Sequence, residues 1–107
     1  MAYRVTWSTR ALDDIDSIAS YIARDSPAYA SAVVSRIINT ARALRQFPFA
    51  GRVVPEFNDT NLRERFVYSY RVIYRIEDKT VTVAAVVHGK RLLMKALNKD
   101  VETKSDV

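Results

Sequence analysis

The side chains best suited to chemistry in this chain are arginines that recur at alternate positions in its second half. A lone histidine and a lysine–arginine pair follow them at the end of the last apolar segment. The candidate target-binding residues are Arg63, Arg65, Arg71, Arg75, His88, Lys90 and Arg91. A guanidinium binds phosphate or carboxylate through paired hydrogen bonds, and histidine titrates near neutral pH. These residue types predict a site that binds a phosphate or an acidic surface.

The composition of the 107-residue chain excludes most cofactor chemistry. The chain has no cysteine, which excludes disulfides, thiol nucleophiles, iron–sulfur clusters and cysteine-ligated zinc. Its one histidine has no surrounding carboxylate cluster that would complete an ordinary metal site. No apolar run approaches the ~20 residues of a membrane helix, and residues 1–7 do not resemble a signal peptide. We therefore expect a cytoplasmic domain with no metal, no cofactor and no membrane contact.

The formal net charge of +5 is concentrated in one segment of the chain. Residues 62–99 contain nine basic and three acidic side chains, a net charge of +6. Such a segment attracts nucleic acid or an acidic protein. The alternative is a solvated charged surface that has no dedicated partner.

Two helices are predicted in the first half, after a short strand at residues 3–7. Ser8 or Thr9 can cap the first helix, and Ser26 followed by Pro27 can start the second. The apolar stripe of the first helix comprises Leu12, Ile15, Ile18 and Ile22. That of the second comprises Ala30, Val33, Val34, Ile37, Ile38, Ala41 and Leu44. Both spacings are those of a helix with one buried face.

Three strands are predicted in the second half, after loop-like residues 48–61. They cover residues 62–68, 70–76 and 80–88. The order β-α-α-β-β-β predicts an α+β fold, in which two N-terminal helices pack on one face of a mainly antiparallel four-stranded sheet. We expect one domain over residues 1–98, with helical turns within 90–98, and a flexible polar tail at 99–107.

Side-chain alternation divides the strand at residues 70–76 into two faces. One face comprises Tyr70, Val72, Tyr74 and Ile76. The other comprises Arg71, Ile73 and Arg75. We expect the helices to cover the first face and leave the second exposed, with Arg63 and Arg65 beside it on the neighbouring strand. The alternatives are cross-strand ion pairs with Glu64 and Glu77, or arginines that serve solubility alone.

Four segments match, in order along the chain, the motifs of one known superfamily. The earliest is the alternating start followed by Ala11-Leu12-Asp13-Asp14-Ile15. Next comes a proline–glycine–arginine–proline–glutamate loop, matched by Phe47-Pro48-Phe49-Ala50-Gly51-Arg52-Val53-Val54-Pro55-Glu56. Central strands are matched by Leu62-Arg63-Glu64 and Tyr70-Arg71-Val72-Ile73-Tyr74-Arg75-Ile76, and a last strand by Val86-Val87-His88-Gly89-Lys90-Arg91. Over residues 3–93 the chain thus resembles the RelE/ParE toxins, and its His-Gly-X-Arg ending is frequent in the ParE-like branch.

The resemblance implies the toxin of a type II toxin–antitoxin pair. Such toxins are neutralised by an acidic antitoxin whose C-terminal segment wraps the toxin as a helix and a strand. A basic, cysteine-free domain suits a partner of this kind, so we expect a toxin–antitoxin hetero-oligomer. The superfamily has two branches. The RelE branch cuts mRNA in the ribosomal decoding site without a metal, and the ParE branch poisons DNA gyrase.

The resemblance also assigns roles under a nuclease mechanism. Arg71 and Arg91 match phosphate-binding arginines of the RelE branch, and Arg63 and Arg65 can stand for its basic pair. His88 is the available general acid or base. The C-terminal tyrosine of that branch is missing after Arg91. The tyrosines of the central strands are expected to pack the sheet, and they are Tyr68, Tyr70 and Tyr74.

An incomplete acid–base set favours the ParE-like function, in which gyrase is poisoned without covalent chemistry by the toxin. Glu64 lies between two arginines that should lower its pKa, which makes it a weak base. We expect Arg71 to be exposed, so that Arg71→Ala leaves folding intact. The alternatives are a ribosome-dependent mRNA endonuclease on the same fold and a non-toxic module that only binds an antitoxin.

Overall fold

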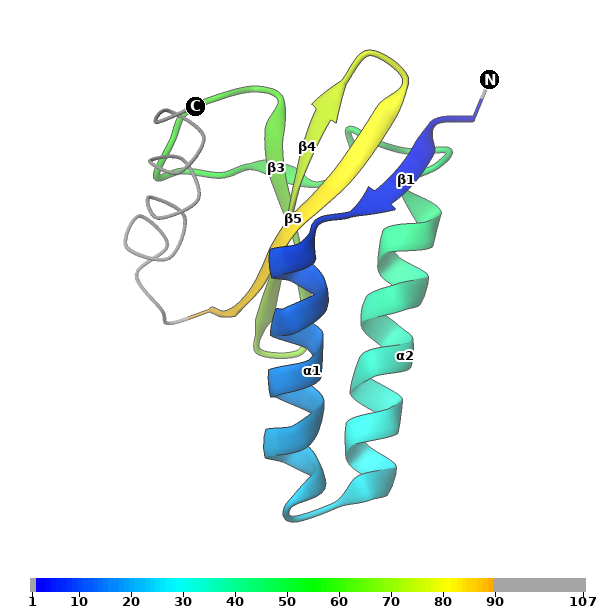
Figure 1. The fold of residues 1–107 in the computed structure, drawn as a ribbon. Coiled ribbons are helices and arrows are strands. Elements are labelled where there is room, and N and C mark those ends of the chain that lie inside the picture. The colour runs from blue at the N-terminus through cyan, green and yellow to red at the C-terminus, as the bar shows by residue number, and fades with distance from the viewer. Residues whose placement is uncertain (1, 90–107) are drawn as a thin grey trace.

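Five strands form one sheet, and two helices pack against one of its faces (Figure 1). This computed structural model describes residues 2–89. Its elements are β1 (Arg4–Trp7), α1 (Thr9–Ala23), α2 (Pro27–Ala43), β2 (Arg52–Val53), β3 (Leu62–Val67), β4 (Tyr70–Glu77) and β5 (Thr80–His88). The predicted α+β fold with two N-terminal helices is confirmed. The helical turns predicted within 90–98 and the tail at 99–107 lie outside the described residues.

The strand order across the sheet is β1-β5-β4-β3-β2, which makes β1 and β2 the outer strands. The pairing of β1 with β5 is parallel, and the other pairings are antiparallel. The sheet has five strands rather than the predicted four, because Arg52 and Val53 pair with Glu64 and Arg63. A two-residue strand inside a loop has no alternation that a sequence pattern could detect.

Both helices begin at the predicted caps. The Ser8 hydroxyl accepts the Ala11 N–H at 3.0 Å, and the Ser26 hydroxyl accepts the Tyr29 N–H at 3.1 Å. Pro27 occupies the first turn of α2, where its missing N–H costs nothing. The helices have 15 and 17 residues, and neither is long and apolar enough to cross a membrane.

The buried stripe of α1 differs from the predicted one at its start. Leu12 is 52% exposed, and Ala11 takes the buried position ahead of Ile15. Two contacts set this rotation: the Ser8 hydroxyl donates to the Ala84 carbonyl at 2.9 Å, and the Asp14 carboxylate accepts the Val86 N–H at 2.9 Å. Both bonds tie α1 to β5 beside the irregular register between β4 and β5. The helix is therefore oriented by polar contacts that a hydrophobic pattern does not contain.

The sheet has an apolar core on each face. The core under the helices includes Val33, Ile37, Ala41, Val67, Val72, Val83 and Val86. On the opposite face the loop between β2 and β3 packs Val54 and Phe57 over Ile73 and Ala85. The expectation of an exposed second face is therefore wrong for the middle of the sheet, since this loop covers it.

Candidate functional site

The register between β3 and β4 separates the candidate arginines into two groups. Arg63 is opposite Tyr74 and Arg65 opposite Val72, so both lie on the helix side of the sheet. Arg71 is opposite Phe66, on the other side. Directly opposed residues in an antiparallel pair share a face. The expectation that Arg63 and Arg65 share a face with Arg71 is therefore wrong, because the two-residue connection between β3 and β4 fixes the other register.

Arg71 is buried, with 5% of its surface exposed, in a cluster of four charged side chains. Its Nη1 and Nη2 donate to the two carboxylate oxygens of Glu56 at 2.8 Å each, and its Nε donates to Glu64 Oε1 at 2.5 Å. The second oxygen of Glu64 accepts from Arg52 Nε at 2.5 Å. The expected exposure of Arg71 is thus wrong, and a cross-strand pair with Glu64 is present instead.

The charges in this cluster, defined here as Arg52, Glu56, Glu64 and Arg71, stabilise one another. The hydrogen bonds that Arg71 donates to Glu56 and Glu64 outweigh burial and raise the pKa of Arg71, with Glu56 the larger cause. The hydrogen bond from Arg71 likewise lowers the pKa of Glu56. Two arginines face two glutamates, so the charges of the cluster balance, with Arg71 and Glu64 buried and Arg52 and Glu56 exposed. Removing Arg71 or Glu64 would leave the other buried charge with only its exposed partner, which is costly.

The loop that contributes Glu56 is attached to the sheet by Tyr74. The buried Tyr74 hydroxyl accepts the Gly51 N–H at 3.0 Å and donates to the Pro48 carbonyl at 2.8 Å. A Cβ at Gly51 would lie 2.5 Å from both the Glu64 carbonyl oxygen and the Tyr74 hydroxyl, so only glycine fits there. The predicted packing role is confirmed for Tyr74 and the half-buried Tyr70, whereas Tyr68 is 55% exposed.

The other candidate residues lie at the margins of the sheet. Arg63 donates to the carbonyls of Thr60 at 2.8 Å and Gly51 at 3.0 Å. Arg75 pairs with Asp59 at 3.2 Å rather than with Glu77. The exposed His88 packs edge-on against Tyr70, with ring centroids 5.7 Å apart. Arg65 forms no ion pair with any residue of 2–89. Lys90 and Arg91 lie outside the described residues.

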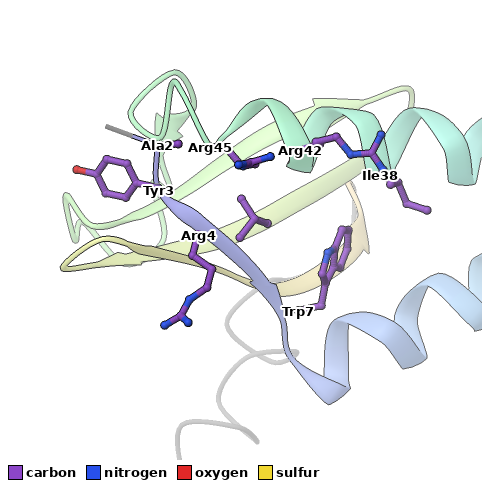
Figure 2. Close-up of a pocket in the computed structure, with 8 residues that line it drawn as sticks. Ala2, Tyr3, Arg4, Trp7, Ile38, Arg42 and Arg45 are labelled. Atoms are coloured by element: carbon purple, nitrogen blue, oxygen red, sulfur yellow. The ribbon is translucent and has the colours of Figure 1, made fainter.

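A groove of about 500 Å³ lies between β1 and the end of α2 (Figure 2). Trp7 and Ile38 provide apolar walls, and Arg42 and Arg45 line it from the end of α2 and the turn that follows. Arg4 points away from α2, on the other side of the strand. None of these three arginines pairs with an acidic side chain within the part of the chain that the structure describes. In the sequence, the only feature that indicates this groove is that Arg42 and Arg45 lie off the apolar stripe of the second helix.

The outer edge of β1 points backbone groups toward this groove. Arg4 and Ser8 donate their N–H groups to Lys79 and Val83 at 2.9 and 3.0 Å, so alternate residues face β5. Val5 and Trp7 consequently direct their N–H and C=O groups away from the sheet, because pairing sides alternate along a strand. β1 is the last strand on this side. An extended peptide can therefore pair with it.

Comparison with known protein families shows which family the chain belongs to. The family model described as the ParE toxin of the type II toxin–antitoxin system parDE matches residues 5–93. The chain belongs to this family. Toxin RelE2 of Caulobacter vibrioides is 32% identical over 90 residues, which cover 83% of this chain and 98% of that toxin. A shorter match, to Y4kP of Sinorhizobium fredii, is 43% identical over 49 residues, 46% of this chain and 51% of that protein.

Solved structures support the same fold for this ParE family member. A chain of the chromosomal ParDE system from Pseudomonas aeruginosa superposes with a TM-score of 0.68 at 19% identity, over 81% of this chain and 96% of that one. Other structures of this fold are complexes of a toxin with its antitoxin. The chain is thus the toxin of a type II toxin–antitoxin system in the ParE/RelE superfamily. Residues 2–89 contain no group of acidic and histidine side chains that would hold a metal ion.

Proposed function

We propose that this ParE family member poisons DNA gyrase and does not cleave RNA. The state of Arg71 supports this choice most directly. A RelE-type nuclease uses an arginine at the matching position to bind the phosphate, where cations must stabilise the charge that develops. In this chain the guanidinium of Arg71 is already bound by the carboxylates of Glu56 and Glu64. A substrate phosphate would have to displace both.

The buried cluster also removes one candidate base. Both oxygens of Glu64 accept hydrogen bonds from arginines, and the side chain is 1% exposed. A general base must come within hydrogen-bond reach of the proton that it takes. Glu64 has no access to a substrate hydroxyl, which leaves His88 as the candidate acid–base group within residues 2–89. Loss of one such group typically costs ~10²–10⁴-fold in rate.

A gyrase poison has weaker chemical requirements. It must hold a protein–DNA intermediate by shape and charge, and it transfers no proton itself. Arginines on β3 and beside it that have no carboxylate partner among residues 2–89 can supply that charge. These arginines are Arg36, Arg63 and Arg65.

The cognate antitoxin, in this proposal, occupies the groove between β1 and α2. The free edge of β1 offers backbone pairing to an extended segment, and Trp7 and Ile38 offer apolar contact. Arg42 and Arg45 on one side of the edge and Arg4 on the other favour acidic side chains. These three arginines lie outside the strongly basic segment 62–99, so antitoxin binding and target binding use separate positive surfaces.

The test is the order of events after the toxin is induced in cells. We expect DNA replication to stop before translation, with double-strand breaks, and His88→Ala to retain most of the toxicity. Purified toxin should stabilise the cleaved gyrase–DNA complex. Cleavage of ribosome-bound mRNA that disappears in His88→Ala would contradict the proposal and favour the nuclease. A chain that binds its antitoxin but does not inhibit growth would be a non-toxic binding module.

A further inference from the structure

The edge of the sheet formed by β3 carries three arginine–aromatic contacts. The Arg63 guanidinium lies 4.9 Å from the ring centre of Phe49, that of Arg52 lies 5.3 Å from Phe66, and that of Arg36 lies 6.0 Å from Tyr68. The three rings are 51%, 54% and 55% exposed, respectively. Within residues 2–89, every arginine that stacks on a ring does so here.

These side chains come from β3 and from the segments beside it. β2 pairs only with Arg63 and Glu64, so the rest of β3 is the outer edge from Arg65 onward. Arg63 and Arg65 border this edge from the helix side, and Phe66 borders it from the other. From Arg63 to Tyr68 the strand spans about 17 Å at the usual rise per residue. We call the set Arg36, Phe49, Arg52, Arg63, Arg65, Phe66 and Tyr68 the β3-edge strip.

The charge of the strip is positive and largely uncompensated. Arg36, Arg63 and Arg65 have no carboxylate partner among the described residues. Arg52 bonds to the buried Glu64, yet its own side chain remains 58% exposed. Tyr68 also contacts the ring of Tyr29, with centroids 6.1 Å apart, yet more than half of each of the three rings remains exposed beside arginines that have no carboxylate partner. Such rings and arginines are the two components of a surface for single-stranded nucleic acid, in which bases stack on rings and phosphates contact guanidiniums.

We propose that the β3-edge strip binds single-stranded DNA, with bases stacked on Phe66 and Tyr68 and phosphates held by Arg36 and Arg65. The assignment to DNA rather than RNA rests on the proposed action at gyrase. The binding itself needs no gyrase, and it uses no residue of the groove between β1 and α2. The strip is thus a second surface, which an antitoxin in the groove would leave open.

The test measures binding of the full-length chain to a fluorescent single-stranded DNA of about 12 thymidines, a length within the usual range of such sites. An RNA of the same length, made of uridines, is measured in parallel. The double variant Arg36→Gln with Arg65→Gln should bind more weakly. Its plot of log affinity against log salt should be shallower by about 1.4, because two phosphate contacts are lost. Phe66→Leu keeps an apolar side chain without the ring, and should weaken binding about fivefold or more.

The matched control removes the same charge from residues that line the groove beside β1. Arg42→Gln with Arg45→Gln lowers the net charge equally, and its salt dependence should stay like that of the unmodified chain. Thermal unfolding must show that each variant is folded. No DNA binding at low salt, or an equal loss in the control, would overturn the proposal. Tighter binding of RNA than of DNA would overturn the assignment to DNA. Binding to DNA without gyrase poisoning would contradict only the proposed function.

Discussion

Arg65 and Arg71 lie on neighbouring strands, yet their surroundings have little in common. Arg71 is buried and bound by Glu56 and Glu64, whereas Arg65 has no ion-pair partner in residues 2–89. Both are arginines at alternate strand positions, and both were candidates for binding a target. The register places them on opposite faces, and only the face of Arg71 contains acidic partners. The role of an arginine here is therefore set by which side chains share its face.

The strongest test of this contrast is to remove each arginine separately. Arg71→Ala should lower the free energy of unfolding by about 3–5 kcal/mol, because it leaves the buried Glu64 with only the exposed Arg52 as a partner. Arg65→Ala should change it by no more than about 0.5 kcal/mol. Urea unfolding of the two variants measures the difference. A stable Arg71→Ala that loses only its toxicity would show that Arg71 binds the target, contrary to the structural role inferred above.

If Arg71→Ala does not fold at all, a second variant keeps the question open to measurement. Glu64→Leu with Arg71→Met removes both buried charges and fills similar volumes. Replacing a buried ion pair by apolar side chains is often neutral. We expect this double variant to be more stable than Arg71→Ala. The opposite order would mean that the charge imbalance is not the cause of the instability.

The buried Tyr74 and the exposed Tyr68 should also differ in their contribution to the free energy of unfolding, by less than the two arginines do. Tyr74→Phe removes the acceptor of the buried Gly51 N–H and should cost about 1–3 kcal/mol of unfolding free energy. Tyr68→Phe is the control, since that hydroxyl is at an exposed turn. Thermal and urea unfolding of both variants would check this. Equal stabilities would mean that the loop is held without the Tyr74 hydroxyl.

The arginines of the groove should affect association rather than stability. Arg42→Gln with Arg45→Gln should slow binding of an acidic antitoxin by about threefold to tenfold at low salt, and less at high salt. Stopped-flow kinetics at two salt concentrations would measure this. Arg36→Gln with Arg65→Gln removes the same charge from residues that do not line the groove. Equal slowing by both double variants would show that only net charge matters, and that the groove is not the docking site.

The smallest expected effect concerns pH. Arg71 lowers the pKa of Glu56 in the folded chain, so this ion pair stabilises the fold above the ordinary glutamate pKa of about 4.3. The stabilisation is lost as the pH falls through the lower folded pKa. Glu56→Gln should flatten this acid dependence, and Glu77→Gln should not, since Glu77 is exposed and unpaired within residues 2–89. Urea unfolding as a function of pH measures both, and identical profiles would contradict the role of Glu56.

Much of the fold was predictable from local patterns. Serine caps before apolar stripes identified both helices, and the alternation at residues 70–76 identified the two faces of β4. The motifs over residues 3–93 indicated the superfamily that the family model then matched. The misplaced residues were those whose position depends on distant contacts. Leu12 is exposed because Ser8 and Asp14 anchor α1 to β5.

By itself the sequence determined which residues are arginine, which positions alternate, and where each element begins, because these follow from neighbours a few residues apart. It also determined the basic charge and the absence of cysteine. Only the tertiary structure decided which arginines remain available. Glu56 reaches Arg71 across fifteen residues of chain because a loop anchored by Tyr74 folds over the sheet. The groove likewise exists only because α2 ends beside β1. The spacing of side chains along a strand specifies which face each one lies on. Which side chains it then contacts depends on how distant segments pack against that face.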